Sequence, residues 1–225
     1  MAFSLVWQDN SVNTANASSY SFTSQTFGAV PNAGETRHLP VAVSTIETGG
    51  SSPFVTALTV GGTSATEQIA AEVATEAAAA IWNVNQPTGT TGTVAVTLGA
   101  SADGCAIDVF RMIDPLSLTA EDTITDLTPS SGVLNLNNTQ SNGGGTIGIV
   151  QSRNASTTTW NANITARSDV EPAVGNFHSA ASGTTAGSPT TITATNADTT
   201  PSTYIGAVAS WKPGGIPIGQ ALLYA

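Results

Sequence analysis

Charged and chemically reactive side chains are scarce in this sequence. Its 225 residues include only five Lys or Arg, two His and one Cys, and charged residues make up 9% of the chain. General acid–base, nucleophilic and metal-assisted catalysis need such side chains in clusters, and here they are scattered. Enzymatic chemistry is therefore not expected of this protein.

Cationic side chains are too dispersed to form a patch. Arg37, Arg111, Arg153, Arg167 and Lys212 stand apart from one another, and the formal net charge is −10 at pH 7. A protein that neutralises nucleic-acid phosphates or binds an anionic membrane needs clustered Lys and Arg. We therefore expect no direct nucleic-acid or membrane partner. An acidic surface also fits a position that faces away from nucleic acid.

The single cysteine provides no disulfide framework within this sequence. Cys105 enters an apolar run after Gly104, which predicts a small buried hydrophobic side chain and not a nucleophile. No run approaches the roughly 20 apolar residues of a membrane-spanning helix. Residues 1–4 also lack the basic start and apolar core of a signal peptide.

Threonine, serine and short apolar runs are abundant instead. Ser and Thr account for 58 residues, and 40% of the chain is hydrophobic. Thr favours strands because it is β-branched. Apolar runs that recur about every 8–15 residues between Gly, Pro, Asn and Ser are typical of sandwiches and barrels. The pattern predicts an all-β protein, an antiparallel β-sandwich that is jelly-roll-like.

The expected strands follow these apolar or alternating runs. Phe3, Leu5 and Trp7 alternate with polar residues and predict an edge strand. Further strands are expected at residues 20–27, 38–44, 54–60, 81–84, 94–98, 107–113, 145–151, 157–164, 176–181, 190–195 and 204–211. Residues 114–131 are expected to be a connector.

Residues 64–80 depart from this pattern. Ile69, Val73 and Ala77 are spaced four residues apart, as on one face of a helix, and the alanine run 77–80 favours helix by propensity. The sequence therefore predicts one short helix at about residues 64–80, with a loop excursion between strands as the alternative.

An internal echo suggests two halves of similar layout. Val94 and Ile107 begin expected strands 13 residues apart, and so do Ile192 and Ile205. In each case a turn rich in Thr and Gly precedes the first strand, and a turn that contains Asp joins the pair.

The echo places pseudo-repeated halves at about residues 27–113 and 132–212. No Gly/Ser linker separates them, so a single sandwich domain over residues 1–212 is favoured, and two small domains stay open as the alternative. Residues 213–225 form an apolar tail outside the pattern.

Two histidines and two acidic turns are candidate cation ligands. His38 and His178 have no other His or Cys nearby in sequence, whereas a zinc site needs about four ligands. Asp103–Gly104 and Asn196–Asp198 could offer oxygens to calcium, but ordinary Asx turns explain both better. We therefore expect no metal and no other cofactor.

Three glutamates are the candidate carboxylates for glycoside hydrolysis. That reaction needs two carboxyl groups that flank a cleft. Glu67, Glu72 and Glu76 are spaced instead like the solvated face of the expected helix, which is the favoured interpretation.

Aromatic side chains could stack on sugars if they lined one face. Trp7, Trp82, Trp160 and Trp211 each lie in an apolar strand, which favours core packing. Trp160 is the candidate glycan contact, because the Thr and Asn residues around it are polar.

The tail is the candidate partner-docking element. Its apolar density is unusual for a solvated segment, and an extended segment can add a strand to an exposed sheet edge. Docking on a neighbouring subunit and folding back on its own sandwich are equally favoured. The candidate docking residues in the tail and in the first expected strand are Ile216, Ile218, Leu222, Leu223, Tyr224, Phe3, Leu5 and Trp7.

One stretch of the chain resembles virion structural proteins of tailed bacteriophages. It has an aromatic-bearing strand at residues 80–84, a Pro-Thr-Gly-Thr-Thr-Gly-Thr turn at residues 87–93 and a β-branched strand at residues 94–97. Residues 107–111 and 207–213 fit the same pattern, and the resemblance covers roughly residues 27–213. It implies a β-sandwich that builds or decorates a phage particle.

These observations together predict a non-enzymatic virion structural protein. We expect it to decorate or cement the outer surface of the capsid, with other virion proteins and copies of itself as partners. The alternative is a tail-associated appendage or a carbohydrate- or receptor-binding module, with a host glycan as partner. A glycan-degrading enzyme is the third and least favoured hypothesis.

Overall fold

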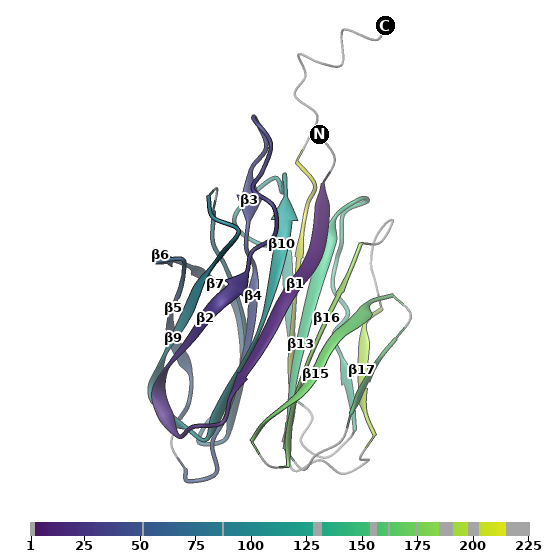
Figure 1. Cartoon of the computed structure of the whole chain (residues 1–225). Helices are drawn as coiled ribbons and strands as arrows, with labels where there is room; N and C mark the ends of the chain where they lie inside the picture. Colours follow the sequence, from purple (N-terminus) through teal and green to yellow (C-terminus); the bar gives the residue numbers. More distant parts are fainter. Residues whose placement is uncertain are drawn as a thin grey trace, which may run out of the picture.

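The protein is built from β-strands alone in the part of the chain that the structure describes (Figure 1). The computed structural model describes residues 3–50, 52–86, 88–127, 132–153, 157–161, 163–173, 175–184, 191–197 and 203–214. Several antiparallel sheets pack together within these ranges, so the expectation of an all-β sandwich is confirmed.

The first half of the chain forms two sheets. The first inner sheet has the order β1-β10-β4-β8-β7, with the short β3 beside β10, and the first outer sheet has the order β2-β9-β5-β6. The strands are β1 (Ser4–Asn13), β2 (Ala17–Thr26), β3 (Arg37–His38), β4 (Val41–Ile46), β5 (Val55–Val60), β6 (Thr63–Ser64), β7 (Thr66–Val73), β8 (Ala77–Asn83), β9 (Thr91–Ala102) and β10 (Gly104–Ile113).

The second half also forms two sheets. The second inner sheet has the order β11-β18-β13-β16-β15, and the second outer sheet has the order β12-β17-β14. The strands are β11 (Asp122–Leu127), β12 (Val133–Asn135), β13 (Gly145–Arg153), β14 (Thr158–Trp160), β15 (Thr165–Ala173), β16 (Asn176–Gly183), β17 (Thr193–Asn196) and β18 (Thr203–Trp211).

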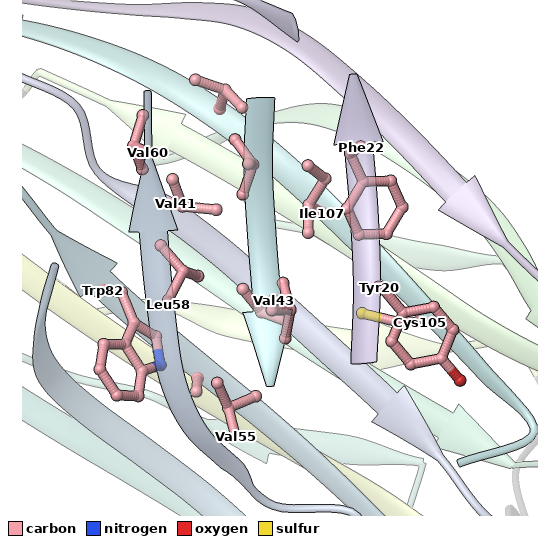
Figure 2. Packing of buried hydrophobic residues seen from close by; sticks show 14 of the residues in the cluster. Tyr20, Phe22, Val41, Val43, Val55, Leu58, Val60, Trp82, Cys105 and Ile107 are labelled. Atoms are coloured by element: carbon pink, nitrogen blue, oxygen red, sulfur yellow. The ribbon is translucent and has the colours of Figure 1, made fainter. Parts of the chain in front are cut away.

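The four sheets stack as layers with an apolar core between each neighbouring pair. Leu58 and Ile107 belong to the core between the first outer and inner sheets (Figure 2). Phe110 and Ile149 belong to the central core, to which both inner sheets contribute. Leu134 belongs to the core between the second inner and outer sheets. The central core joins the two halves into one packed body.

The two halves have the same strand order. If β3 and β6 are set aside, each half has eight strands, and the orders 1-8-3-6-5 and 2-7-4 describe the inner and outer sheets of both halves. One eight-stranded unit therefore occurs twice in the chain, once from Ser4 and once from Asp122.

A pseudo-twofold axis relates the two units. β4 lies against its equivalent β13, β1 lies against β15, and β7 lies against β11. The inner sheets thus face each other with their strand orders reversed, which is the arrangement of an isologous dimer. The chain has the architecture of a symmetric dimer whose subunits are fused.

The axis passes through a bridge between two prolines. Pro115, just after β10, pairs antiparallel with Pro213, just after β18. Leu116 N donates to Lys212 O (3.0 Å), and Gly214 N donates to Asp114 O (2.7 Å). These reciprocal bonds join the ends of the two eighth strands.

The jelly-roll expectation is not confirmed, although part of its pairing is present. Strand pairs 1–8, 2–7 and 3–6 in each half are those of an eight-stranded ribbon rolled up on itself. The fifth strand departs from that scheme, because β7 and β15 pair with the sixth strand in the inner sheet.

The expected helix at residues 64–80 is wrong, because this segment forms the β7–β8 hairpin. Ile69, Ala71 and Val73 alternate along β7 and face the central core, and the turn contains Thr75 at φ +67°. Every residue of β8 is buried, as expected for a strand covered on both faces. Burial of the small alanine side chains between three layers outweighs their helix propensity.

The sequence echo aligns strands that are equivalent in the two halves. In the second pair, however, the aligned residues face opposite sides of their sheets, so the alignment is off by one residue. Val94 and Ile192 both face outer cores, whereas Ile107 faces an outer core and Ile205 the central core. Successive residues of a strand point to opposite faces, so a shift of one residue reverses the side chain. The expected connector at residues 114–131 contains β11, which begins the second unit.

We predict one cooperative unfolding transition for the whole chain, because the central core belongs to both halves. Phe110→Ala removes a fully buried ring from this core and should lower the free energy of unfolding by about 3–5 kcal/mol. Val30→Ala, at a valine that is 51% exposed, should change it by less than about 0.5 kcal/mol. Urea denaturation followed by near-UV circular dichroism measures both, and two separate transitions would contradict the prediction.

Candidate functional site

Asp108 is the centre of a buried cluster of polar side chains. Its Oδ1 accepts a hydrogen bond from Trp7 Nε1 (2.6 Å), and its Oδ2 accepts one from Ser168 Oγ (2.6 Å). His178 Nε2 lies 2.6 Å from the same Oδ2, and His178 Nδ1 lies 2.7 Å from Ser44 Oγ. These five side chains therefore form one connected hydrogen-bond network, which we call the Asp108 cluster.

Both halves of the molecule contribute to the Asp108 cluster. Trp7, Ser44 and Asp108 come from β1, β4 and β10, whereas Ser168 and His178 come from β15 and β16. The contact between carboxylate and imidazole thus crosses the interface between the two inner sheets. A buried carboxylate is tolerated only when hydrogen bonds replace the water it has lost.

The chemistry of the cluster is limited by its burial. A serine, a histidine and an aspartate in contact are the components of a nucleophilic triad. Ser44, Asp108 and His178 have no exposed surface, however, and a nucleophile must reach its substrate. In this arrangement the three groups hold the inner sheets together and present no reacting atom at the surface.

The sequence contained one signal for this cluster that the functional reasoning missed. Asp108 is a lone charge inside the apolar run Ile107–Phe110, and a charge at a core-facing strand position requires a partner. By sequence alone, His178 is a candidate only for metal binding. Its pairing with Asp108 depends on the packing of the two halves, which no sequence spacing reveals.

Arg37 is a second buried charge, and carbonyl oxygens surround its guanidinium. Burial, and to a smaller extent the nearby Arg111, lowers the pKa of Arg37. The turn that it holds belongs to the Pro-Thr-Gly-Thr motif on which the phage resemblance depends. The five carbonyl acceptors are those of Gln86, Gly28, Ala29, Thr88 and Gly89.

His38 lies in a setting unlike that of a metal ligand. Its side chain is buried, its Nδ1 is 3.4 Å from Asn83 Nδ2, and burial lowers its pKa to about 4. Across the described ranges, no group of three His, Cys, Asp or Glu side chains is placed to hold a metal ion.

Asp103 organises a loop contact through hydrogen bonds. Its carboxylate accepts from Thr48 N (2.9 Å), from Thr48 Oγ1 and from Asn16 Nδ2 (2.9 Å). The hydrogen bond from the Thr48 side chain is the main cause that holds the pKa of Asp103 below its usual range. Asp198, the acidic residue of the other candidate turn, lies outside the described residues.

The three candidate glutamates have different surroundings. Glu67 and Glu72 lie on β7 with much of their surface exposed. Partial loss of water around its carboxylate raises the pKa of Glu67. The same effect, and to a smaller extent the negative charge of Glu67, raises the pKa of Glu72. Glu76 lies in the β7–β8 turn and accepts a hydrogen bond from Thr203 Oγ1 of the second half. The expected helical face does not exist, and Glu76 instead links the two halves.

Trp160 is a core residue, so the expected glycan contact through its ring does not hold. The side chain is 8% exposed, and Nε1 donates to Ser179 Oγ (3.0 Å). A methyl group placed on Gly148 would come within 2.8 Å of the Trp160 ring, which shows how closely β13 packs on it. Trp82 and Trp211 are also buried.

The first strand faces its own core with the side chains that were expected to dock a partner. Leu5 is buried in the central core, and Phe3 and Trp7 pack against that core. These three side chains therefore pack against the core of their own chain. Ile216, Ile218, Leu222, Leu223 and Tyr224 lie outside the described residues.

A hollow lies beside the connection between the halves. Lys212 Nζ is 3.7 Å from Glu121 Oε2 at its rim, and Leu116 is strongly exposed there. It offers one ion pair and two apolar side chains, which define no ligand chemistry. The lining residues are Leu116, Ser117, Thr119, Ala120, Glu121 and Lys212.

No protein-family model, curated protein or solved structure matches this chain. In the described part, no helix is long and apolar enough to cross a membrane. The function must therefore be argued from the geometry of this chain.

His178→Ala should destabilise the protein strongly, because it removes a partner of the buried Asp108 carboxylate. We expect a loss of about 3–5 kcal/mol in the free energy of unfolding. Lys212→Ala, which removes a partly exposed ion pair, should cost less than about 1 kcal/mol. Urea denaturation compares the two, and an equally small effect of both substitutions would show that Asp108 does not depend on His178.

His38 should make stability fall in acid. Its pKa is about 4 in the folded protein against 6.5 in the unfolded chain. Between these values only the unfolded chain binds the proton, so stability decreases as the pH falls from 6.5 towards 4, by about 3 kcal/mol in total. Unfolding free energies at pH 7 and pH 4.5 for the natural protein and for His38→Gln measure this term, and equal losses in both would contradict it.

Proposed function

We propose that this chain is a non-enzymatic structural protein of a bacteriophage virion, which decorates or cements the outer surface of the capsid. The observation that carries the proposal is the burial of the Asp108 cluster between the two halves. The polar groups best suited to chemistry are used to join two sandwich units into one body. Such a body acts through its surfaces.

The architecture supports a connecting role. Two equivalent units face away from a shared core, and the inner sheets end in edge strands on both sides of the molecule. Many weak contacts made by a repeated subunit add up to firm attachment. The net charge of −10 favours an outward position, where neighbouring nucleic acid does not repel the protein.

The aromatic side chains support this role over glycan binding. The exposed large hydrophobic residues of the described chain are valines and leucines, and Trp82, Trp160 and Trp211 lie in cores. Sugar-binding faces usually present aromatic rings with one accessible side. A receptor-binding function would therefore have to use the polar loops.

Antibody labelling of purified phage particles tests the proposed function. Gold label distributed over the head, together with recovery of the chain from washed particles, is the expected result. Label confined to the tail would keep a virion role and overturn capsid decoration. Absence of the chain from purified particles would overturn the virion proposal, and an unrelated structural protein of the same phage serves as the labelling control.

A further inference from the structure

The four edge strands of the inner sheets are protected to different degrees. Free edges attract further strands unless proline, bulges or charged side chains block them. β15 contains Pro172 and two register shifts, and β7 carries Glu67 and Glu72 with one shift. β1 spans ten residues without Lys, Arg or Pro and has a single shift. The fourth edge, β11, has only six residues, so β1 is the longest weakly protected edge of these sheets.

Exposed valines lie on both faces of this edge. Val6 is 43% exposed and pairs with Arg111, whereas Val12 is 36% exposed and pairs with Ala106. The bulge between Trp7 and Asp9 turns the two valines to opposite faces of the sheet. An added strand would contact an apolar side chain on each face.

The acidic residue of β1 is already occupied within the chain. Asp9 Oδ1 accepts a hydrogen bond from Asn10 N (2.9 Å), and Asp9 Oδ2 accepts one from Thr26 N (2.8 Å). Both carboxylate oxygens are therefore already hydrogen-bonded within the chain. An incoming strand without charge would meet little electrostatic resistance there.

The pseudo-twofold axis points to the segment that could supply such a strand. After β10 the chain passes the Pro115–Pro213 bridge and forms β11, the first strand of the other unit. Residues 215–225 follow β18 in the equivalent way. Both eighth strands already have a first strand beside them, because β1 covers β10 and β11 covers β18. Neither eighth strand therefore has an open neighbouring position in its inner sheet.

The composition of residues 216–225 suits strand addition, because its one proline, Pro217, lies at the start of the segment, where a strand tolerates proline. The segment contains no charged side chain, in a protein with a net charge of −10. Its apolar side chains are Ile216, Ile218, Leu222, Leu223 and Tyr224.

The direction of the chain favours a neighbour as acceptor. β1 begins beside the end of β10, since Ser4 pairs with Ile113, and Gly214 bonds to Asp114 at that same end. A segment that left Gly214 and ran along β1 of its own chain would be parallel to β1. All strand pairs of the described sheets are antiparallel, and antiparallel pairing is slightly more stable per residue. A neighbouring copy allows the antiparallel pairing.

We propose that residues 216–225 of one copy add as an antiparallel strand to the free edge of β1 in a second copy. Main-chain hydrogen bonds supply the affinity, and Val6 and Val12 supply the apolar contacts. The contact joins different surfaces of the two copies, so repetition produces a ring or an open chain. The proposal concerns the purified chain and stands whether or not the virion role is correct.

Sedimentation velocity over a range of concentrations tests the self-association. The full chain should form oligomers, and a chain that ends at Gly215 should be monomeric. Val6→Lys with Val12→Lys should weaken association about tenfold or more, because lysine on an edge blocks strand addition. Val30→Lys, which introduces the same residue change once at an exposed valine outside the strands, is the control and should associate normally.

A synthetic peptide of residues 216–225 keeps the test decisive if the shortened chain fails to fold. Added in excess to the full chain, the peptide should dissociate the oligomers by occupying β1. A full chain that is monomeric at every concentration would overturn the proposal. So would oligomers that persist in the Val6→Lys, Val12→Lys double variant or in the presence of the peptide.

Discussion

The whole structure depends on one carboxylate that is buried between two sheets and must find hydrogen-bond partners there. The two inner sheets pack face to face over a core of apolar side chains, and Asp108 lies between them without exposure. Its oxygens are bonded to Trp7, Ser168 and His178, so the charge is compensated without water. Because His178 and Ser168 come from the second half, this carboxylate gains these two hydrogen-bond partners only when the halves dock correctly.

The cluster also makes two similar units unequal. β10 and β18 occupy equivalent positions, yet only β10 carries an acidic residue, since β18 reads Thr-Tyr-Ile-Gly-Ala-Val-Ala-Ser-Trp. A buried polar group can select one register among several apolar alternatives. The apolar core provides most of the burial between the halves, and the off-axis cluster distinguishes one side of the pseudo-twofold axis from the other.

The features that the sequence predicted are those set by alternation and turn residues. The all-β class and a first strand through Leu5 and Trp7 follow from local patterns, and the structure has both, with β1 beginning one residue after Phe3. The hairpin at residues 64–80 could not be predicted locally, because alanine favours helix until neighbouring sheets bury it from both sides. The Asp108 cluster could not be predicted locally either, because its members are far apart in sequence: Ser44 and His178 are separated by 134 residues.

The Pro115–Pro213 bridge gives the molecule a polarity. β1 begins, β10 and β18 end, and Gly214 is held at the same end of the layered body (Figure 1). The turns that join β1 to β2 and β15 to β16 lie at the opposite end, separated from the first end by the ten-residue strand β1. A segment attached at either boundary of the body would therefore leave from the same end, and the loops at the opposite end would face away from it.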